Sequence, residues 1–243
     1  MQENIKIAGI PIQINSVYDS LGNSADDYKT QEKPQIIINV TVQDIINEEA
    51  KSKAECAYEK IAYPNFTTSQ LENTAIYRKI AMELPKFDAT VFHGSAVAVN
   101  DEAYLFTAKS GTGKTTHTNL WLQNINGSYI INGDKPILRI IDGKVNVCGT
   151  PWMGKEGLGT NKTVPLKSIC FLRRGEQNKI THAEFNKVMP ELIGQSYRPP
   201  NGDMLIKTVK LLERIGKSVK LYELECNMED EAALVAYEGM KDD

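Results

Sequence analysis

One segment constrains the fold of this chain more than any other, because it has the composition of a phosphate-binding loop between a strand-like and a helix-like stretch. It reads Ser110-Gly111-Thr112-Gly113-Lys114-Thr115-Thr116. A polyphosphate is bound by several backbone N–H groups that converge on it, which needs glycines that adopt positive φ and permit close approach. Gly111 and Gly113 meet that need. A helix that opens at Lys114 adds its N–H groups and the positive end of its dipole. The segment therefore predicts a nucleotide-binding α/β protein.

Two side chains of this phosphate loop have predicted roles of their own. Lys114 is expected to reach the outer phosphates, and the Thr115 hydroxyl to ligate Mg²⁺. The full pattern G-x-x-x-x-G-K-[ST] has glycine where this chain has Ala108, so the first turn departs slightly from it. The alternative is a glycine-rich connection without a ligand, and Lys114-Thr115 at the start of the helix argue against it.

A metal–nucleotide site also needs a carboxylate at the end of a neighbouring strand. Asp134 follows the strand-like run 129–131, and the spacing from Lys114 leaves room for one helix and a returning strand. In the alternative, Asn132-Gly133-Asp134 is a turn in which the aspartate only caps the loop. The phosphate loop nearby favours a metal-binding role for Asp134, together with Thr115.

The length and the net charge of the chain limit the classes of protein to which it can belong. A chain of 243 residues fits one large domain, or one domain with a smaller partner. The formal net charge of −3 provides no basic field for nucleic acid or acidic membranes. The first residues lack a secretion signal, and no run approaches the ~18 apolar residues of a membrane span. We therefore expect a cytoplasmic protein that binds neither nucleic acid nor membranes, and the sequence is compatible with a homo-oligomer.

Patterns of apolar residues predict a small α+β region over residues 1–88 and a larger region over residues 89–243. In the first region we expect strands near 5–14 and 36–40 and helices from 42 and over 68–84. Asp142-Gly143 is typical of a two-residue hairpin turn, between strands 137–141 and 144–148. The other elements expected in the second region are strands at 90–93, 95–99, 104–107, 129–131, 166–172 and 219–224, and helices at 115–123, 185–195, 204–216 and 229–240.

The four cysteines are scattered without C-x-x-C spacing, and three of them lie in apolar, strand-like runs. Buried, reduced thiols are therefore expected. The segment 149–165 is rich in glycine and contains Trp152, so we expect a loop near the site rather than in the core.

The phosphate loop resembles that of the HPr kinase/phosphorylase and phosphoenolpyruvate carboxykinase superfamily. His93-Gly94 precedes it by two strands, as a His-Gly pair does in the HPr-kinase branch, and the resemblance covers roughly residues 91–175. The chain is too short for a carboxykinase proper. The resemblance implies a mixed β-sheet P-loop core of the HPr kinase/PEP carboxykinase type with a small N-terminal α+β region. It also implies ATP and Mg²⁺, and transfer of the γ-phosphoryl to a serine-type hydroxyl on a peptide or protein.

The alternatives are a kinase that acts on free serine or another small molecule, and a nucleotide-binding module without catalysis. HPr kinases carry two adjacent aspartates after the strand, of which the first is credited as the base toward the acceptor, whereas this chain has Gly133-Asp134. The candidates for the base are His93, Asp134 with a double role, and Glu156. Gly157-Leu158-Gly159 resembles the Gly-Leu-Gly of the HPr-kinase signature.

Several other polar residues have a functional and a structural interpretation. His93 at a strand end either relays a proton or is satisfied by the backbone. Arg173-Arg174 either neutralise phosphate charge or form a solvated strand end. For His117 and His182 we expect structural roles. The acceptor, and whether the donor is ATP, another nucleotide or pyrophosphate, stay open, and the N-terminal region is the expected place for acceptor recognition.

Overall fold

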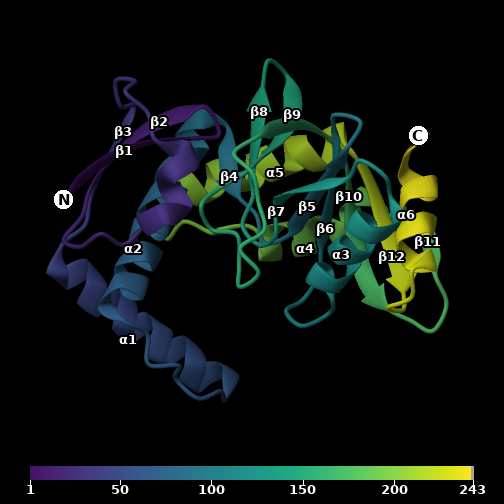
Figure 1. Cartoon of the computed structure of the whole chain (residues 1–243), viewed down its shortest axis with the longest axis horizontal. Helices are drawn as coiled ribbons and strands as arrows, with labels where there is room; N and C mark the ends of the chain where they lie inside the picture. Colours follow the sequence, from purple (N-terminus) through teal and green to yellow (C-terminus); the bar gives the residue numbers. More distant parts are fainter. Residues whose placement is uncertain (242–243) are drawn as a thin grey trace. The chain divides into compact units, whose positions relative to one another are not determined.

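The computed structural model describes residues 1–241 and divides into two compact units, Met1–Glu83 and the part from Leu84 onward. Figure 1 labels the elements. The first unit contains a short 3-10 helix at Gly22–Tyr28 and these regular elements: β1 (Gln2–Ile7), β2 (Ile10–Asn15), β3 (Ile36–Asn39), α1 (Val42–Glu59) and α2 (Thr68–Glu83). Within residues 1–241, every helix is too short or too polar to cross a membrane.

The first unit is built on a three-stranded sheet in the order β1-β2-β3. β1 and β2 form an antiparallel hairpin, and β3 pairs with β2 in parallel. Thr41 begins α1 with a capping box, in which its side chain and that of Asp44 each bond the other's backbone N–H. On α2, the buried carboxylate of Glu72 accepts from the backbone N–H groups of Val17 and Tyr18 at 2.6 and 2.9 Å. These bonds attach the chain that leaves β2 to the helix.

The second unit contains one large mixed sheet and four α-helices. Its helices are α3 (Lys114–Asn124), α4 (Phe185–Gln195), α5 (Gly202–Ser218) and α6 (Glu231–Lys241), and a 3-10 turn at Leu84–Phe87 precedes the sheet. Its strands are β4 (Ala89–Val91), β5 (Ser95–Val99), β6 (Glu102–Thr107), β7 (Tyr129–Asn132), β8 (Ile137–Ile141), β9 (Lys144–Cys148), β10 (Thr163–Arg174), β11 (Lys179–His182) and β12 (Lys220–Cys226).

The long strand β10 organises this nine-stranded sheet. Its first residues pair with β9 in antiparallel register, and the antiparallel neighbours β8 and β4 follow. Its remaining length lies between β6 and β12, and both pairings are parallel. β5 continues the sheet beyond β6, and β7 pairs with β5. The parallel strands β6, β10 and β12 therefore end at one edge, and β6 leads directly into the phosphate loop.

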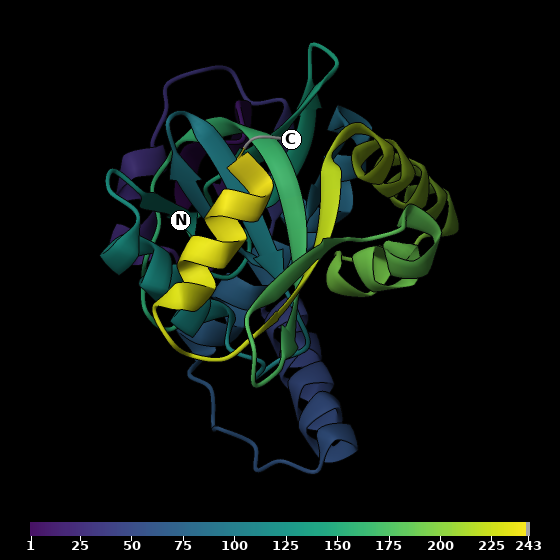
Figure 2. The same ribbon diagram turned by 90° about the vertical axis from the view of Figure 1, so that its right-hand side faces the viewer.

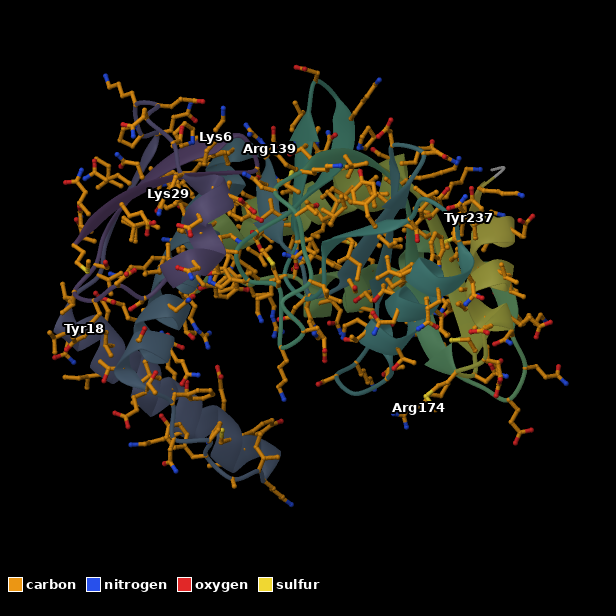
Figure 3. All side chains as sticks on the ribbon, viewed as in Figure 1. Lys6, Tyr18, Lys29, Arg139, Arg174 and Tyr237 are labelled. Carbon is orange, nitrogen blue, oxygen red and sulfur yellow. The ribbon has the colours of Figure 1, made fainter. Side chains whose placement is uncertain are left out.

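Helices cover both faces of the sheet, each over its own apolar core (Figure 2). On one face, α4 and α5 pack through Leu192 and Leu212 against strand residues such as Leu105. On the other, α3 and α6 pack around Trp121, which contacts Tyr104 and Tyr237 edge-on or tilted. Figure 3 labels Tyr237 on α6. Because β5, β6 and β10 are covered on both faces, their sequences read as apolar runs rather than as alternating patterns.

The predicted elements are confirmed in kind, with changes at their boundaries. The Asp142-Gly143 hairpin and the helix after the phosphate loop are present as expected. The prediction that the loop continues to residue 165 was wrong, because β10 begins at Thr163, where its first residues pair with β9. The prediction that His93 ends a strand was also wrong, since β4 stops at Val91. The mixed α/β class itself is confirmed.

Candidate functional site

The phosphate loop connects the end of β6 to the start of α3. Gly111 and Gly113 have φ of +75° and +120°, as the sequence predicts for a loop that turns its N–H groups inward. A Cβ at either position would meet nothing within 4 Å, so the backbone conformation, and not the space, demands glycine. Lys114 is half-buried and its ammonium donates to the Ala108 carbonyl at 3.4 Å. The lysine therefore lies folded along the loop that it follows.

One cavity of about 490 Å³ brings together residues that are far apart in the sequence. The phosphate loop forms one wall, and His93 and Asp134 form another, while Glu156 comes from the loop after β9. Of the predicted site residues, the cavity is lined by His93, Ser110, Gly111, Gly113, Lys114, Thr115, Thr116, Asp134 and Glu156. Thr112 lies instead in the wall of two other cavities, on the flank of the loop toward β10.

Asp134 is positioned by Asn132, for which the sequence predicts no role beyond that of a turn residue. The fully buried Asn132 Oδ1 accepts from the backbone N–H groups of Asp134 and Lys135 at 2.9 and 2.7 Å. Its amide nitrogen donates to the carbonyl and hydroxyl oxygens of Thr150, both at 3.0 Å. This arrangement is an Asx turn, and it fixes the direction in which the Asp134 carboxylate leaves the strand end.

The Asp134 carboxylate lies among cationic or protonatable groups. Its Oδ2 accepts from Lys135, and its Oδ1 is 3.6 Å from His93 Nε2. Burial lowers the pKa of Lys114, while the field of Asp134 acts in the opposite direction and favours the charged ammonium. The site thus contains fixed charges of both signs in a partly buried cavity, the environment in which electrostatic effects on transferred groups are large.

His93 is held by the end of α4. Its backbone N–H donates to the Gln195 carbonyl at 2.7 Å, and its ring Nδ1 bonds Gln195 Oε1 at 2.7 Å. Since an amide oxygen only accepts, this bond places the ring proton on Nδ1 and leaves the Nε2 lone pair facing Asp134. Burial, followed by the charge of Lys114, lowers the pKa of His93 below its usual 6.5. The imidazole is therefore neutral near pH 7 and can accept a proton at Nε2.

Gly133 occupies the position of the first of the two adjacent aspartates in the resembled family. Its N–H donates to the Leu158 carbonyl at 3.0 Å. A Cβ on Gly133 would lie 2.8 Å from the Met153 carbonyl oxygen and 3.3 Å from that of Leu158. The backbone of the loop after β9 therefore fills the space that a side chain would need. A side chain at this position would therefore displace the loop.

The loop after β9 closes a third side of the cavity. Gly154 approaches Asp134 so closely that a Cβ on the glycine would lie 2.9 Å from the Asp134 Cβ. Glu156 lines the cavity but is exposed, with Gly154 and Gly157 on either side in positive φ. Within the part of the chain that the structure describes, the Glu156 carboxylate forms no ion pair. His93, by contrast, is held by its bond to Gln195, and Asp134 by its ion pair with Lys135.

The two arginines that end β10 differ in their contacts. Arg173 forms ion pairs with Glu191 at 2.7 Å and with Glu223 at 2.9 Å, which satisfies its guanidinium within the structure. The exposed side chain of Arg174 donates to the Gly111 carbonyl of the phosphate loop (Figure 3). Arg174 therefore supports the loop from the side opposite Asp134.

The side-chain oxygens near the phosphate loop are of the type that Mg²⁺ prefers as ligands. Thr115 supplies an exposed hydroxyl oxygen and Asp134 a carboxylate oxygen, and both line the same cavity. Among residues 1–241, no cluster of three or more His, Cys, Asp or Glu forms a metal cage. Mg²⁺ in nucleotide sites takes only one or two protein oxygens and completes its shell with phosphates and waters. The donor set therefore suits a metal that arrives with a polyphosphate.

The other histidines and the cysteines agree with structural roles. Trp121 donates to Nε2 of the buried His117 at 3.1 Å, and His182 packs its ring against Tyr222 in β12. All four cysteines are free, and burial raises the pKa of the Cys148 thiol to about 11. Burial also raises the pKa values of the Cys170 and Cys226 thiols, so these three thiols are protonated at pH 7.

Neither a protein-family model nor a curated protein matches this sequence. Among solved structures, the chain is similar to the Hpr(Ser) kinase/phosphatase from Coxiella burnetii. The sequence identity is 12% and the TM-score is 0.28, over 52% of this chain and 92% of that one. Values this low describe a distant structural similarity, so the function must be argued from the geometry of the cavity itself.

Proposed function

We propose that this protein is an ATP-dependent phosphotransferase with a P-loop core of the HPr-kinase-like type. It would move the γ-phosphoryl of ATP to a serine-type hydroxyl on a peptide or protein. The observation that supports this most is the convergence of the phosphate loop, Lys114, Asp134 and His93 on one cavity. A loop of this type binds polyphosphate, and a neutral imidazole beside a carboxylate can accept the proton of an attacking hydroxyl.

Each residue of the cavity has its own proposed role in phosphoryl transfer. The loop N–H groups and the Lys114 ammonium bind and orient the phosphates, so that the acceptor attacks in line. Nε2 of His93 takes the hydroxyl proton, while the Nδ1 bond to Gln195 keeps the imidazole in the tautomer that can do so. Thr115 and Asp134 would hold Mg²⁺, which when bound neutralises charge on the phosphate oxygens. Asp134 also stabilises the imidazolium that forms, since the two side chains are 3.6 Å apart.

A transfer assay with γ-labelled ATP tests the proposal. The acceptors are peptides encoded near this protein's own coding region and free serine, and added phosphate is identified by mass spectrometry. We expect labelled peptide, and labelled serine alone would instead support the small-molecule kinase. ATP binding without transfer to any acceptor would support the non-catalytic module.

Lys114→Ala should reduce transfer by at least about a hundredfold, because it removes the cation that neutralises the outer phosphates. Lys109→Ala is the matched control, since Lys109 is an exposed lysine of the same loop that does not line the cavity. Unchanged transfer in Lys114→Ala, or equal losses in both variants, would contradict the proposed site.

A further inference from the structure

Helix α1 of the first unit packs on α2 with one face and has an exposed apolar stripe on the opposite face (Figure 1). The packed face is buried and contains Ile45, Glu48, Ser52 and Cys56. Glu48 on this face pairs with Arg78 of α2 at 2.8 Å. With about 3.6 residues per turn, the other side of the helix carries apolar residues at every third or fourth position. These exposed residues form the α1 stripe: Val42, Ile46, Ala50, Ala54, Ala57, Tyr58 and Ile61.

The α1 stripe has large side chains at both ends and small ones in the middle. The large residues have exposed fractions of 55% for Val42, 52% for Ile46, 89% for Tyr58 and 56% for Ile61. The three residues between them are alanines. Single exposed apolar residues are ordinary on a protein surface, whereas a contiguous apolar patch is typical of a binding surface. Apolar residues at this spacing form the face that one helix presents to another.

The order of large and small side chains along the α1 stripe is nearly the same in both directions. In an antiparallel pair of α1 helices centred near residue 52, Ile46 of one copy lies opposite Tyr58 of the other. Ala50 of one copy then lies opposite Ala54 of the other. Alanines at the centre let two helix backbones approach closely, since the distance between helices depends on the side chains at the contact. The larger side chains fill the two ends, so the stripe is complementary in shape to a second copy of itself.

The charges beside the α1 stripe also suit a second copy of the chain. Lys51 and Glu55 flank the stripe on one side. Glu49 and Lys53 flank it on the other, where they pair with each other at 2.7 Å. A helix that lies on an acidic membrane carries mainly Lys and Arg on its polar face. Here each flank has one cation and one anion, so two copies of the stripe can meet without net repulsion.

We propose that two copies of this protein associate through the α1 stripe, with their α1 helices antiparallel, and form a symmetric homodimer. A two-fold interface uses the same patch on both copies, so one self-complementary stripe is sufficient. Helix α1 lies outside residues 91–175, which carry the resemblance to HPr kinases, so this interface is a feature of the first unit. Association of this kind is independent of the proposed phosphoryl transfer.

Sedimentation velocity of the full chain over a range of concentrations measures the association. A single pair of helices is a small interface, so we expect the dimer to dominate at about 100 μM and to dissociate on dilution. Ile46→Glu and Tyr58→Glu should each raise the dissociation constant of the dimer at least about tenfold, because each brings two carboxylates into an apolar contact. Leu234→Glu is the matched control, since Leu234 is a 44% exposed leucine on α6. It should leave the association unchanged.

Cysteine cross-linking tests the direction of the two helices. Ala50→Cys and Ala54→Cys each add one exposed thiol, and a disulfide needs Cα atoms within about 7 Å. The antiparallel pair brings position 50 of one copy to position 54 of the other. An equal mixture of the two variants should therefore give more cross-linked dimer than either variant alone. The wild-type protein, with its own four cysteines, gives the background.

A protein that stays monomeric at about 100 μM would overturn the proposal. So would a dimer that persists unchanged in both Ile46→Glu and Tyr58→Glu. Cross-linking that is strongest in each cysteine variant alone would overturn the antiparallel arrangement. Because every substituted position is exposed, we expect each variant to keep the far-UV circular dichroism spectrum of the wild type. A loss of association then reports on the contact between copies, and not on folding.

Discussion

At the scale of single residues, the site depends on side chains that orient other side chains. Gln195 sets the tautomer of His93, and Asn132 sets the direction of Asp134. Neither residue takes part in a recognisable motif. Gln195 acts through a hydrogen bond between residues that are far apart in the sequence, whereas Asn132 acts within a local turn and is itself held by its bonds to Thr150.

The lowered pKa of His93 predicts the pH dependence of transfer. A base must be neutral to accept a proton, so kcat/KM should fall as the pH drops through the pKa of His93, and this acid limb should lie below pH 6.5. His93→Asn removes the base and should lower kcat by about 10²- to 10⁴-fold and abolish that limb. A pH–rate profile of both proteins checks this. A wild-type limb centred above pH 6.5, or one retained in the variant, would exclude His93 as the base.

Asn132→Ala should destabilise the protein by about 1–3 kcal/mol, since the N–H groups of Asp134 and Lys135 would lose their acceptor inside the turn. Transfer should fall as well, because the Asp134 carboxylate would no longer be fixed. Denaturant unfolding and the transfer assay measure the two effects. Asn126→Ala, at an exposed asparagine, should change stability by no more than about 0.5 kcal/mol. Comparable stabilities of the two variants would show that the Asx turn is dispensable.

At the scale of elements, the loop after β9 packs its backbone against the turn after β7. Gly133 donates to Leu158, and Asn132 also forms a bridge with Gly159. The loop therefore behaves as part of the sheet edge. Glycine is needed on both sides of this contact, because a Cβ at Gly133 would strike the Met153 and Leu158 carbonyls and one at Gly154 would strike Asp134.

Gly133→Asp restores the pair of aspartates typical of the resembled family, yet we expect it to reduce activity. The new Cβ would lie 2.8 Å from the Met153 carbonyl, so the loop must shift away from Asp134. Overpacking of this kind costs about 1–3 kcal/mol. Thermal unfolding and the transfer assay are the measurements, and Gly202→Asp, at a glycine with open space around it and no positive φ, controls for the added charge. Faster transfer in Gly133→Asp at undiminished stability would contradict the packing argument.

The sequence predicted elements better than it predicted the relations between them. The conformation of the phosphate loop was predictable because its determinants are local: two glycines, a lysine and a helix start lie within a few residues. The place of Asp134 beside that loop was predictable from its position after a strand. The approach of His93 to Asp134 was not, because it results from the register of β5 with β7 and from the end of α4. The early start of β10 was missed because pairing with β9, and not local pattern, extends it.

At the scale of the whole molecule, each unit has its own core. The first is built on the isoleucines of β1 and β2, and the second on the two faces of its sheet. Every residue that lines the cavity at the phosphate loop belongs to the second unit. We therefore expect nucleotide binding to be a property of the second unit, and we propose that the N-terminal region recognises the acceptor.

A protein that begins at Leu84 should unfold cooperatively and bind ATP within about threefold of the full chain, because its core and cavities are intact. It should lose transfer to the peptide acceptor. Calorimetry and the transfer assay give the two readouts, and Lys114→Ala in the shortened protein is the control for specific binding. Loss of ATP binding in a folded shortened protein would show that the first unit contributes to the nucleotide site, and full transfer would remove its proposed role with the acceptor.

The length of β10 has a consequence for how motion spreads through the second unit. One continuous strand pairs with the β8–β9 hairpin at its start and borders the phosphate loop's strand along the rest. If the hairpin opens, the first residues of β10 lose their partner strand. The later residues of β10 stay paired with β6 on one side and with β12 on the other. A ligand that steadies the loop should slow amide exchange in β10, and through it in β9, although the hairpin residues do not line the cavity at the phosphate loop. The rate of amide exchange in the hairpin would then change when a ligand binds at the phosphate loop.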